Sequence, residues 1–427
     1  KWLWQLAGAQ QNDTHPDNKN MKIGIDGLLL RGRDAGSLRY FELLLESLAN
    51  SEEEPVSDQA TASGVPDHAS YQYIVFANQR VLRSAILPRC SSFSYQETAY
   101  NHFLPSALRQ QVYKKWHALG ELDLLHTPIF VPPLSYPGKS VMTLFDLTFL
   151  LHPHTQKWTG RLWWNLLGAK GFKKAERIIT ISNSTRRDLC QYLGVSQEKV
   201  DVIYPFVSAQ FHPAPRNVST AERRAIADKY NLPEKYILFV STLERRKNIT
   251  SLIQAFSRAR QMGNLEHSLV LVGQPGWLYQ DVYRTIEALD LQKQVILPGY
   301  VPEADLPGIY QAADLFAFLS DYEGFGFPVL EAMACGVPVL TSNASSLPEV
   351  VGQAGIMVAP HDVEQAAAQM VQLLRDTDLR VEMIQRGLEQ ARKFSRAQFQ
   401  QKILAVYQRV IGQSSAVAYS AAPLTAN

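Results

Sequence analysis

The segment Asp321-Tyr-Glu-Gly-Phe-Gly-Phe-Pro-Val-Leu-Glu-Ala-Met-Ala-Cys335 joins an apolar run to a helical run through a loop with two glycines. The helix is expected to begin near Pro328 and to end at Gly336, because proline suits the first helical turn and glycine the end. A helix N-terminus attracts phosphate or a sugar oxygen. Glu323 and Glu331 then offer two carboxylates to two parts of one ligand. The alternative is a tight turn with both carboxylates in solvent.

Short apolar runs alternate with helical segments on both sides of this motif. They cover 22–26, 73–77, 124–126, 140–146, 177–182, 200–203, 236–241, 268–272, 295–297, 315–319 and 337–340. Such alternation predicts parallel sheets with both faces covered by helices. The proline-containing segment 205–220 breaks the rhythm and predicts a domain boundary. The expected fold class is α/β, with two doubly wound, Rossmann-like domains facing a central cleft.

A second candidate site follows the run 236–241, where the chain continues as Glu244-Arg-Arg-Lys-Asn248. Residues at the carboxyl end of a parallel strand face the ligand crevice of an open α/β sheet. Arg246 and Lys247 would neutralise a departing diphosphate there. The alternative is a solvated helix start. Because cations at a helix N-terminus oppose the helix dipole, we favour a functional role.

Composition limits the classes of protein and partner. With 427 residues, 46% apolar and 19% charged, and a net charge of +2, the chain is long enough for two domains and has ordinary globular composition. No nucleic-acid partner is expected. Cys90, Cys190 and Cys335 lie far apart, which predicts neither a zinc site nor a disulfide framework and suits a reducing cytoplasm. No apolar run reaches the ~18 residues of a membrane span.

One stretch leaves membrane contact open. Residues 158–187 combine tryptophans with several lysines and arginines. A solvated helix face is the favoured interpretation, and a peripheral contact with the anionic inner face of a membrane is the alternative.

The two motifs together resemble the retaining glycosyltransferases of the GT-B fold, group 1 and family 4, which carry a Glu-x7-Glu motif. The resemblance extends from Met21 to about Gly412. Segment 21–26 with Gly36, Arg39 and Tyr40 resembles the opening strand and acceptor-side loop of the family. Segments 176–184 and 202–205 resemble the last strands of its N-terminal domain, and 268–278 is most similar to mannosyltransferase-like members that use GDP-mannose.

This resemblance implies a domain plan. It comprises an N-terminal extension (1–20), a Rossmann-like acceptor-binding domain (21–207), a Rossmann-like nucleotide-sugar-binding domain (208–395), a helix returning to the first domain (396–412) and a disordered tail (413–427).

It also implies roles for the matched residues. Catalytic roles fall to Glu323, Arg246, Lys247 and Asp146. Donor contacts fall to Gly36, Ser241, Gly273, Gly324, Phe325, Gly326, Phe327 and Glu331, with Glu331 on the ribose hydroxyls. Arg39, Tyr40 and His126 lie on the acceptor side, although His126 could equally be a structural histidine. The donor is a nucleotide diphosphate sugar, the acceptor a saccharide or lipid-linked molecule, and no metal or cofactor is expected.

The chain departs from the family pattern at the reacting centre. Phe145 stands where members usually have a histidine, and a phenyl ring cannot hydrogen-bond a sugar hydroxyl. His152 or His154 is an alternative source of an imidazole, and a loop histidine in solvent is the simpler interpretation. Two other functions therefore remain as hypotheses: a catalytically weakened sugar-nucleotide-binding subunit of a partner enzyme, and an epimerase on the same fold.

Overall fold

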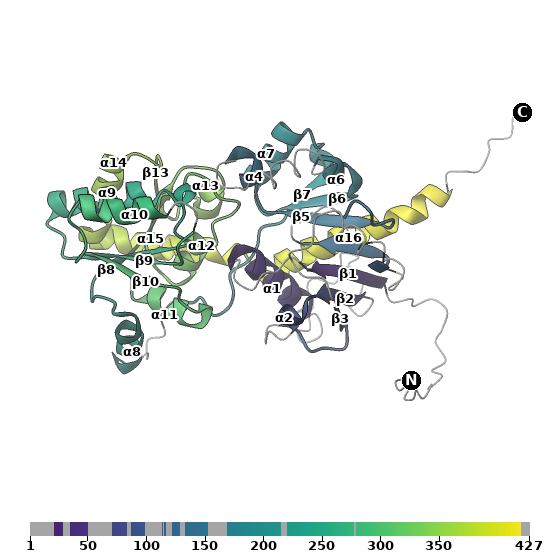
Figure 1. The fold of residues 1–427 in the computed structure, drawn as a ribbon, viewed down its shortest axis with the longest axis horizontal. Coiled ribbons are helices and arrows are strands. Elements are labelled where there is room, and N and C mark those ends of the chain that lie inside the picture. Colours follow the sequence, from purple (N-terminus) through teal and green to yellow (C-terminus); the bar gives the residue numbers. More distant parts are fainter. Residues whose placement is uncertain are drawn as a thin grey trace, which may run out of the picture.

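The structure is a computed structural model that describes residues 21–28, 35–49, 71–82, 87–98, 113, 115–116, 122–128, 133–152, 169–214, 220–276 and 279–419. These residues form two lobes, each built around one parallel sheet (Figure 1). Several predictions fall outside the described residues. They concern the expected extension at 1–20, residues 420–427 of the expected tail, His154, and residues 158–168, which hold the tryptophans of the stretch 158–187.

Within the described residues, the N-terminal sheet has seven strands in the order β3-β2-β1-β4-β5-β6-β7. They are β1 (Met21–Gly27), β2 (Tyr71–Ala77), β3 (Phe93–Glu97), β4 (Leu124–Thr127), β5 (Ser140–Leu144), β6 (Arg177–Thr180) and β7 (Val200–Val202). Its helices are α1 (Ala35–Ala49), α2 (Gln79–Leu82), α4 (Thr148–Leu151), α6 (Ala169–Lys174) and α7 (Asn183–Leu193). The strand order reverses between β1 and β4, and ligands bind at such reversals.

The C-terminal sheet repeats this pattern with six parallel strands in the order β10-β9-β8-β11-β12-β13. They are β8 (Tyr236–Val240), β9 (Ser268–Val272), β10 (Val295–Gly299), β11 (Leu315–Phe318), β12 (Val339–Ser342) and β13 (Ile356–Val358). Helices α8 (Thr220–Tyr230), α9 (Ile249–Gly263), α10 (Gln280–Ala288), α11 (Leu306–Gln311), α12 (Phe327–Ala334), α13 (Leu347–Val351), α14 (Val363–Arg375) and α15 (Thr377–Arg392) complete the domain. The reversal lies between β8 and β11. The prediction of two doubly wound α/β domains is confirmed.

Two edge strands were missed by the sequence analysis. β3 alternates apolar with polar residues, and β13 has only three residues. Both lie at the edge of a sheet, where one side of the strand needs no neighbour. Their short or mixed patterns therefore carried little signal.

Helix α16 (Arg396–Tyr419) runs from the C-terminal lobe along the N-terminal one (Figure 1), where it packs against α1 and β4. Its residues Phe399, Ile403, Tyr407 and Val410 are buried. The amino group of Lys139 donates to the carbonyls of Val410, at 2.6 Å, and Ile411, at 3.0 Å. The predicted helix end at 412 was wrong. Gly412 lies inside the helix, because the serines, alanines and valine that follow contain no proline or left-handed residue to stop it.

Helix α7 has clear boundaries, and its N-terminus lies beside the site described below. The Ser182 hydroxyl caps it by accepting from the backbone N–H of Thr185 at 3.0 Å. Gly194 ends it in the left-handed conformation, with φ 63°.

Candidate active site between the two domains

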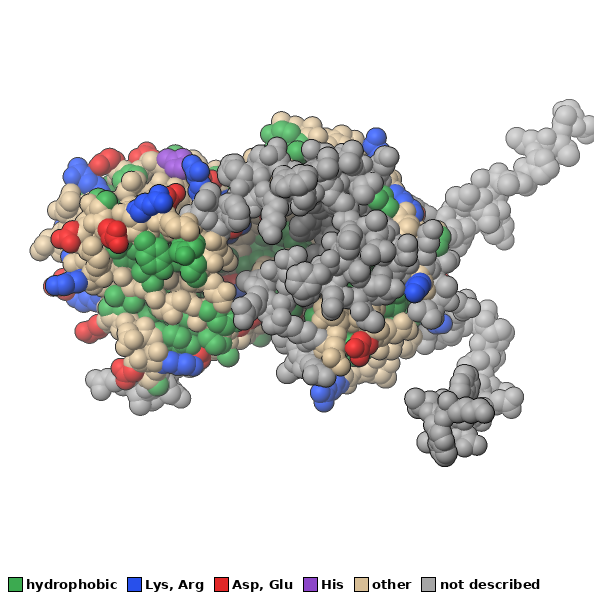
Figure 2. All heavy atoms as spheres, in the orientation of Figure 1, with side chains coloured by type: hydrophobic (Ala, Val, Ile, Leu, Met, Phe, Trp, Pro, Cys, Tyr) green, Lys and Arg blue, Asp and Glu red, His purple; other side chains and the backbone are tan. Residues whose placement is uncertain are grey.

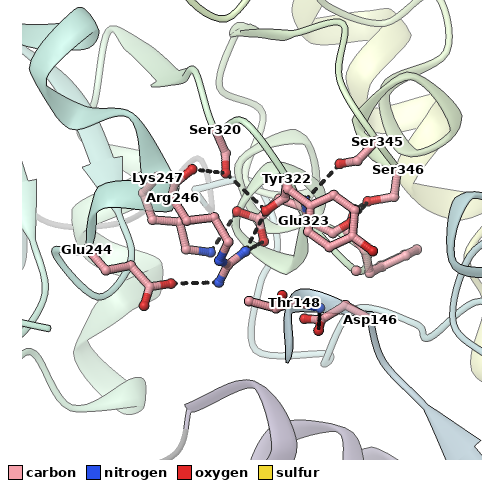
Figure 3. Close-up of polar contacts among 12 residues, drawn as sticks. Asp146, Thr148, Glu244, Arg246, Lys247, Ser320, Tyr322, Glu323, Ser345 and Ser346 are labelled. Carbon is pink, nitrogen blue, oxygen red and sulfur yellow. Dashed lines mark hydrogen bonds and ion pairs between the residues drawn. The ribbon is translucent and has the colours of Figure 1, made fainter. Parts of the chain in front are cut away.

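The central cluster lies on either side of the strand reversal in the C-terminal sheet. Lys247 belongs to a short 3-10 turn (Arg245–Lys247) after β8, and Glu323 belongs to the loop after β11. The Lys247 amino group lies 2.6 Å from Glu323 Oε1, and Arg246 Nη1 lies 3.3 Å from Oε2 (Figure 3). Arg246 Nη2 also pairs with Glu244 at 2.6 Å. Two carboxylates therefore balance two cations in a nearly buried cluster.

Burial and charge act in opposite directions on Glu323. Burial alone would raise its pKa, but Lys247 and Arg246 outweigh burial and hold the pKa of this carboxyl below its usual range. Burial, reinforced by Arg246, lowers the pKa of Lys247, and Glu323 opposes that change. The carboxylate of Glu323 is thus ionised at neutral pH and depends on both cations.

Hydroxyl groups fix the backbone of the Glu323 loop. Ser345 Oγ accepts from the Glu323 N–H at 2.8 Å, and Ser346 Oγ donates toward the carbonyls of Glu323 at 3.0 Å and Phe325 at 2.8 Å. Gly326 precedes helix α12 with φ 111°, a conformation that favours glycine. As predicted, the helix has proline in its first turn, and Gly336 (φ 74°) follows its last residues.

The predicted donor contacts at Ser241 and Gly273 lie at the ends of β8 and β9. A Cβ on Gly273 would meet the carbonyl oxygen of Ser241 at 1.8 Å, so only glycine permits this approach of the two chains. Phe325 is buried, and Phe327 begins helix α12. Gly36 lies exposed in the first turn of α1 with open space around its Cβ direction. The structure therefore brings Ser241 and Gly273 together and shows no described contact of Gly36 with either.

Glu331 lies on α12 with 1% exposure. It accepts a hydrogen bond from the Tyr310 hydroxyl at 2.9 Å and pairs with Arg39 Nη1 at 2.5 Å. Arg39 also pairs with Glu303 at 3.1 Å and covers the ring of Phe211. Sequence analysis placed Arg39 on the acceptor side, whereas here it crosses to the carboxylate assigned to the ribose. This ion pair joins two segments far apart in the sequence, so no local sequence pattern predicts it.

Tyr40 and His126, which were predicted to lie on the acceptor side, both take part in hydrogen bonds inside the structure. Both are fully buried. His126 bonds to Tyr407 at 2.7 Å and to Thr143 at 2.9 Å, and Tyr40 bonds to the same threonine at 3.3 Å. Burial lowers the pKa of His126 to about 3, so the ring is neutral. With both nitrogens engaged, His126 ties β4 and β5 to helix α16.

Asp146 and Phe145 follow β5 on the opposite side of the cleft. Asp146 Oδ1 accepts from the Thr148 N–H at 2.8 Å, and Figure 3 shows it across from Arg246. The Phe145 ring packs edge-on against Tyr40, with centroids 5.1 Å apart, and so belongs to the core. His152 lies near the ring of Tyr322, at 5.3 Å between centroids.

Two contacts between the domains were not predicted. The Tyr322 hydroxyl donates to Asp188 of α7 at 2.8 Å and accepts from the Leu147 N–H at 3.2 Å. Glu349 of α13 accepts from backbone N–H groups of α7. The only local signal was that Tyr322 adjoins Glu323; nothing near Glu349 marked it.

Cavities open between the described parts of the two domains. One of about 370 Å³ is lined by Arg39, Glu42, Leu43, Glu46, Ser208, Gln210 and Glu303. Another of about 640 Å³ lies between α7 and the segment 343–349.

In the described part of the chain, no three or more His, Cys, Asp or Glu side chains are grouped to hold a metal ion. Nor does any described helix combine the length and apolar character needed to cross a membrane.

Two family models match the chain one after the other. Glycosyltransferase Family 4 matches residues 66–211, and Glycosyl transferases group 1 matches residues 222–390. Together they take in most of the chain. The chain thus carries a Glycosyltransferase Family 4 domain followed by a Glycosyl transferases group 1 domain.

Curated relatives of this glycosyltransferase include two bacterial proteins from Escherichia coli. O-antigen chain mannosyltransferase B is 37% identical over 222 residues, covering 52% of this chain and 57% of the relative. Serotype-specific mannosyltransferase WbdA is 34% identical over 275 residues, covering 62% of this chain and 33% of the relative. The chain thus spans from a third to just over half the length of these relatives.

Solved structures agree with the GT-B architecture. Sucrose-phosphate synthase from Thermosynechococcus elongatus has a TM-score of 0.67 at 20% identity, covering 94% of this glycosyltransferase and 100% of that chain. HepE from Anabaena, solved with UDP and glucose, has a TM-score of 0.67 at 20% identity, covering 91% and 100%. At these identities the likeness establishes the fold.

Proposed function

We propose that this glycosyltransferase transfers a hexose, with retention of anomeric configuration, from a nucleotide diphosphate sugar to a saccharide or lipid-linked acceptor. The observation that carries the proposal is the cluster of Arg246, Lys247 and Glu323 at the strand reversal, facing Asp146 of the other domain. Mannose from GDP-mannose is the proposed donor sugar, supported by the two mannosyltransferase relatives.

The cluster suits the departure of a diphosphate. Arg246 and Lys247 are paired with Glu244 and Glu323, so an incoming diphosphate would exchange partners with these carboxylates. Its negative charge grows as the bond from the sugar C1 to the phosphate oxygen breaks, and two fixed cations stabilise that charge. A metal ion is not required for this neutralisation in the proposed mechanism.

The acceptor hydroxyl attacks C1 on the face from which the diphosphate leaves. A bond forms from the acceptor oxygen to C1, the bond from C1 to the phosphate oxygen breaks, and the acceptor proton passes to the departing phosphate oxygen. Glu323 and the backbone of 324–327 hold the sugar, and closure of the domains excludes water.

Calorimetry with GDP and UDP in the presence of a chelator tests the donor site. We expect binding of one nucleotide without metal, weakened at least tenfold in Lys247→Ala and Glu331→Ala, which remove a phosphate and a ribose contact. Glu382→Gln is the control, because this exposed carboxylate pairs with Arg386 on its own helix. Wild-type protein that binds neither nucleotide would contradict the proposal.

Phe145 keeps a second candidate function open, a sugar-nucleotide-binding subunit with weak turnover. Its ring lies in the core against Tyr40 and offers no hydrogen bond to a sugar. Product analysis with GDP-mannose and an oligomannoside distinguishes the two. Transfer by the wild type, with α-anomeric product by NMR, supports the enzyme. Donor binding with turnover only in Phe145→His supports the subunit, and conversion of the free nucleotide sugar would indicate an epimerase.

A lipid-linked acceptor would bring this protein into peripheral contact with a membrane surface. Flotation with anionic liposomes at low and high salt tests it. Absence of salt-sensitive binding would exclude that part of the proposal.

A further inference from the structure

Helix α7 of the N-terminal domain is capped by a carboxylate from the other domain. Glu349 Oε2 accepts from the Asn183 N–H at 2.8 Å, and Glu349 Oε1 accepts from the Ser184 N–H at 2.8 Å. Ser182 already accepts from the Thr185 N–H, so these bonds satisfy the two N–H groups before it, the first two of the helix. The Tyr204 hydroxyl donates to Glu349 at 2.7 Å. All three donors to this carboxylate precede the C-terminal sheet.

Glu349 is also tied to the Glu323 loop through its own chain. It lies on α13, and Ser345 and Ser346, which precede α13, hold the backbone of Glu323 and Phe325. Figure 3 shows both serines beside Glu323. A shift of α13 away from α7 would therefore carry the loop with it.

The first two turns of α7 also contact the segment that follows β5. Thr185 Oγ1 donates to the Phe145 carbonyl at 2.9 Å and lies 3.5 Å from the Gly324 carbonyl. Asp188, one turn later, accepts from Tyr322. Helix α7 thus lies between the end of β5, with Asp146, and the loop with Glu323.

We propose that Glu349 is a positioning residue. It holds the Glu323 loop in place relative to Asp146, which follows β5, when the two domains close. The inference rests on the proposed transfer reaction. Glu349 touches neither reactant in this scheme and acts through α7 and α13. Carboxylate bonds to helix N–H groups are charge-assisted, so their loss weakens closure more than loss of a neutral contact would. The nucleotide contacts proposed above, Arg246, Lys247 and Glu331, all lie on the C-terminal domain, so the nucleotide Kd is expected to be unchanged.

The test compares Glu349→Gln with wild type in three measurements: kcat with GDP-mannose, the nucleotide Kd, and the radius of gyration by small-angle scattering. The amide keeps one acceptor oxygen and places an N–H group against the helix N–H groups. We expect kcat to fall about tenfold or more, an unchanged Kd, and a larger radius of gyration without ligand. Tyr204→Phe, which removes one of the three bonds, should show a smaller fall in kcat.

The matched control is Glu364→Gln, an exposed carboxylate of the same domain that pairs with Arg258. Unchanged kcat in Glu349→Gln, or a nucleotide Kd that rises in proportion to the fall in kcat, would overturn the inference. Wild type without nucleotide binding would instead contradict the proposed function. In that case scattering still decides whether Glu349 holds the domains together, and an unchanged radius in Glu349→Gln refutes it.

Discussion

Arg39 Nη1 and Glu331 Oε1 lie 2.5 Å apart and join helix α1 of one domain to helix α12 of the other. Their side chains are 14% and 2% exposed, so both charges have left water and depend on each other. Under the proposed function, Glu331 receives the donor ribose. Arg39 must then share or release this carboxylate when a nucleotide binds.

Removing one partner of this buried pair should destabilise the protein strongly. Arg39→Gln leaves Glu331 buried without its cation and is expected to cost about 3–5 kcal/mol. Glu331→Gln should cost less, because Arg39 keeps its ion pair with Glu303. The double variant should cost less than the sum, because neither charge then remains. Chemical unfolding of all four proteins measures the coupling. Strict additivity would mean that the two side chains are not paired in solution.

Gly324→Ala should block closure and leave nucleotide binding intact. A Cβ at this position would lie 2.3 Å from the carbonyl oxygen of Phe145 in the other domain, a backbone atom that cannot swing away. We expect kcat to fall at least tenfold while the nucleotide Kd changes little. Gly412→Ala, whose Cβ would meet open space, is the control. Normal kcat in Gly324→Ala would show that the two domains do not approach this closely during turnover.

His126 should make stability fall in acid. Its pKa in the folded protein is about 3, below the ordinary 6.5, so between these values the unfolded chain binds the proton that the folded chain excludes. The free energy of unfolding should fall by up to about 1.4 kcal/mol per pH unit as pH decreases through this range. Unfolding of His126→Gln, measured from pH 6.5 to 4, should show a shallower dependence. Equal slopes would indicate a charged or solvated ring.

Glu42 should make the free energy of unfolding fall as pH rises. Burial, with Glu303 adding to it and Arg39 opposing it, raises the pKa of Glu42 from 4.5 to about 7. The folded protein holds this proton more tightly, so the stability it contributes below pH 4.5 is lost as pH rises through about 7. Glu42→Gln should raise the melting temperature at pH 8 and change it little at pH 5. A variant that melts below wild type at pH 8 would contradict this assignment, and exposed Glu382→Gln is the control.

The distribution of charge on the surface does not mark the candidate site. On the visible face of the C-terminal lobe, acidic and basic side chains are interspersed (Figure 2). Charges that matter for the site are the few that are buried, and burial cannot be read from composition.

The sequence by itself determined the fold class, because apolar periods and glycine or proline positions are local. The strand-loop-helix around Glu323, the basic turn at Arg246 and Lys247, and the restart after 205–220 all have such local patterns. Topology then accounts for why Glu323 and Lys247 meet, since each follows a strand beside the reversal.

Only the tertiary structure decided which partners these residues have. His126 follows a strand end as a ligand contact would, yet α16, from the far end of the chain, brings Tyr407 onto its ring. Arg39 meets Glu331, and Glu349 caps α7, because the two domains pack against each other. Such contacts depend on the relative placement of segments far apart in sequence, and no local propensity encodes that placement.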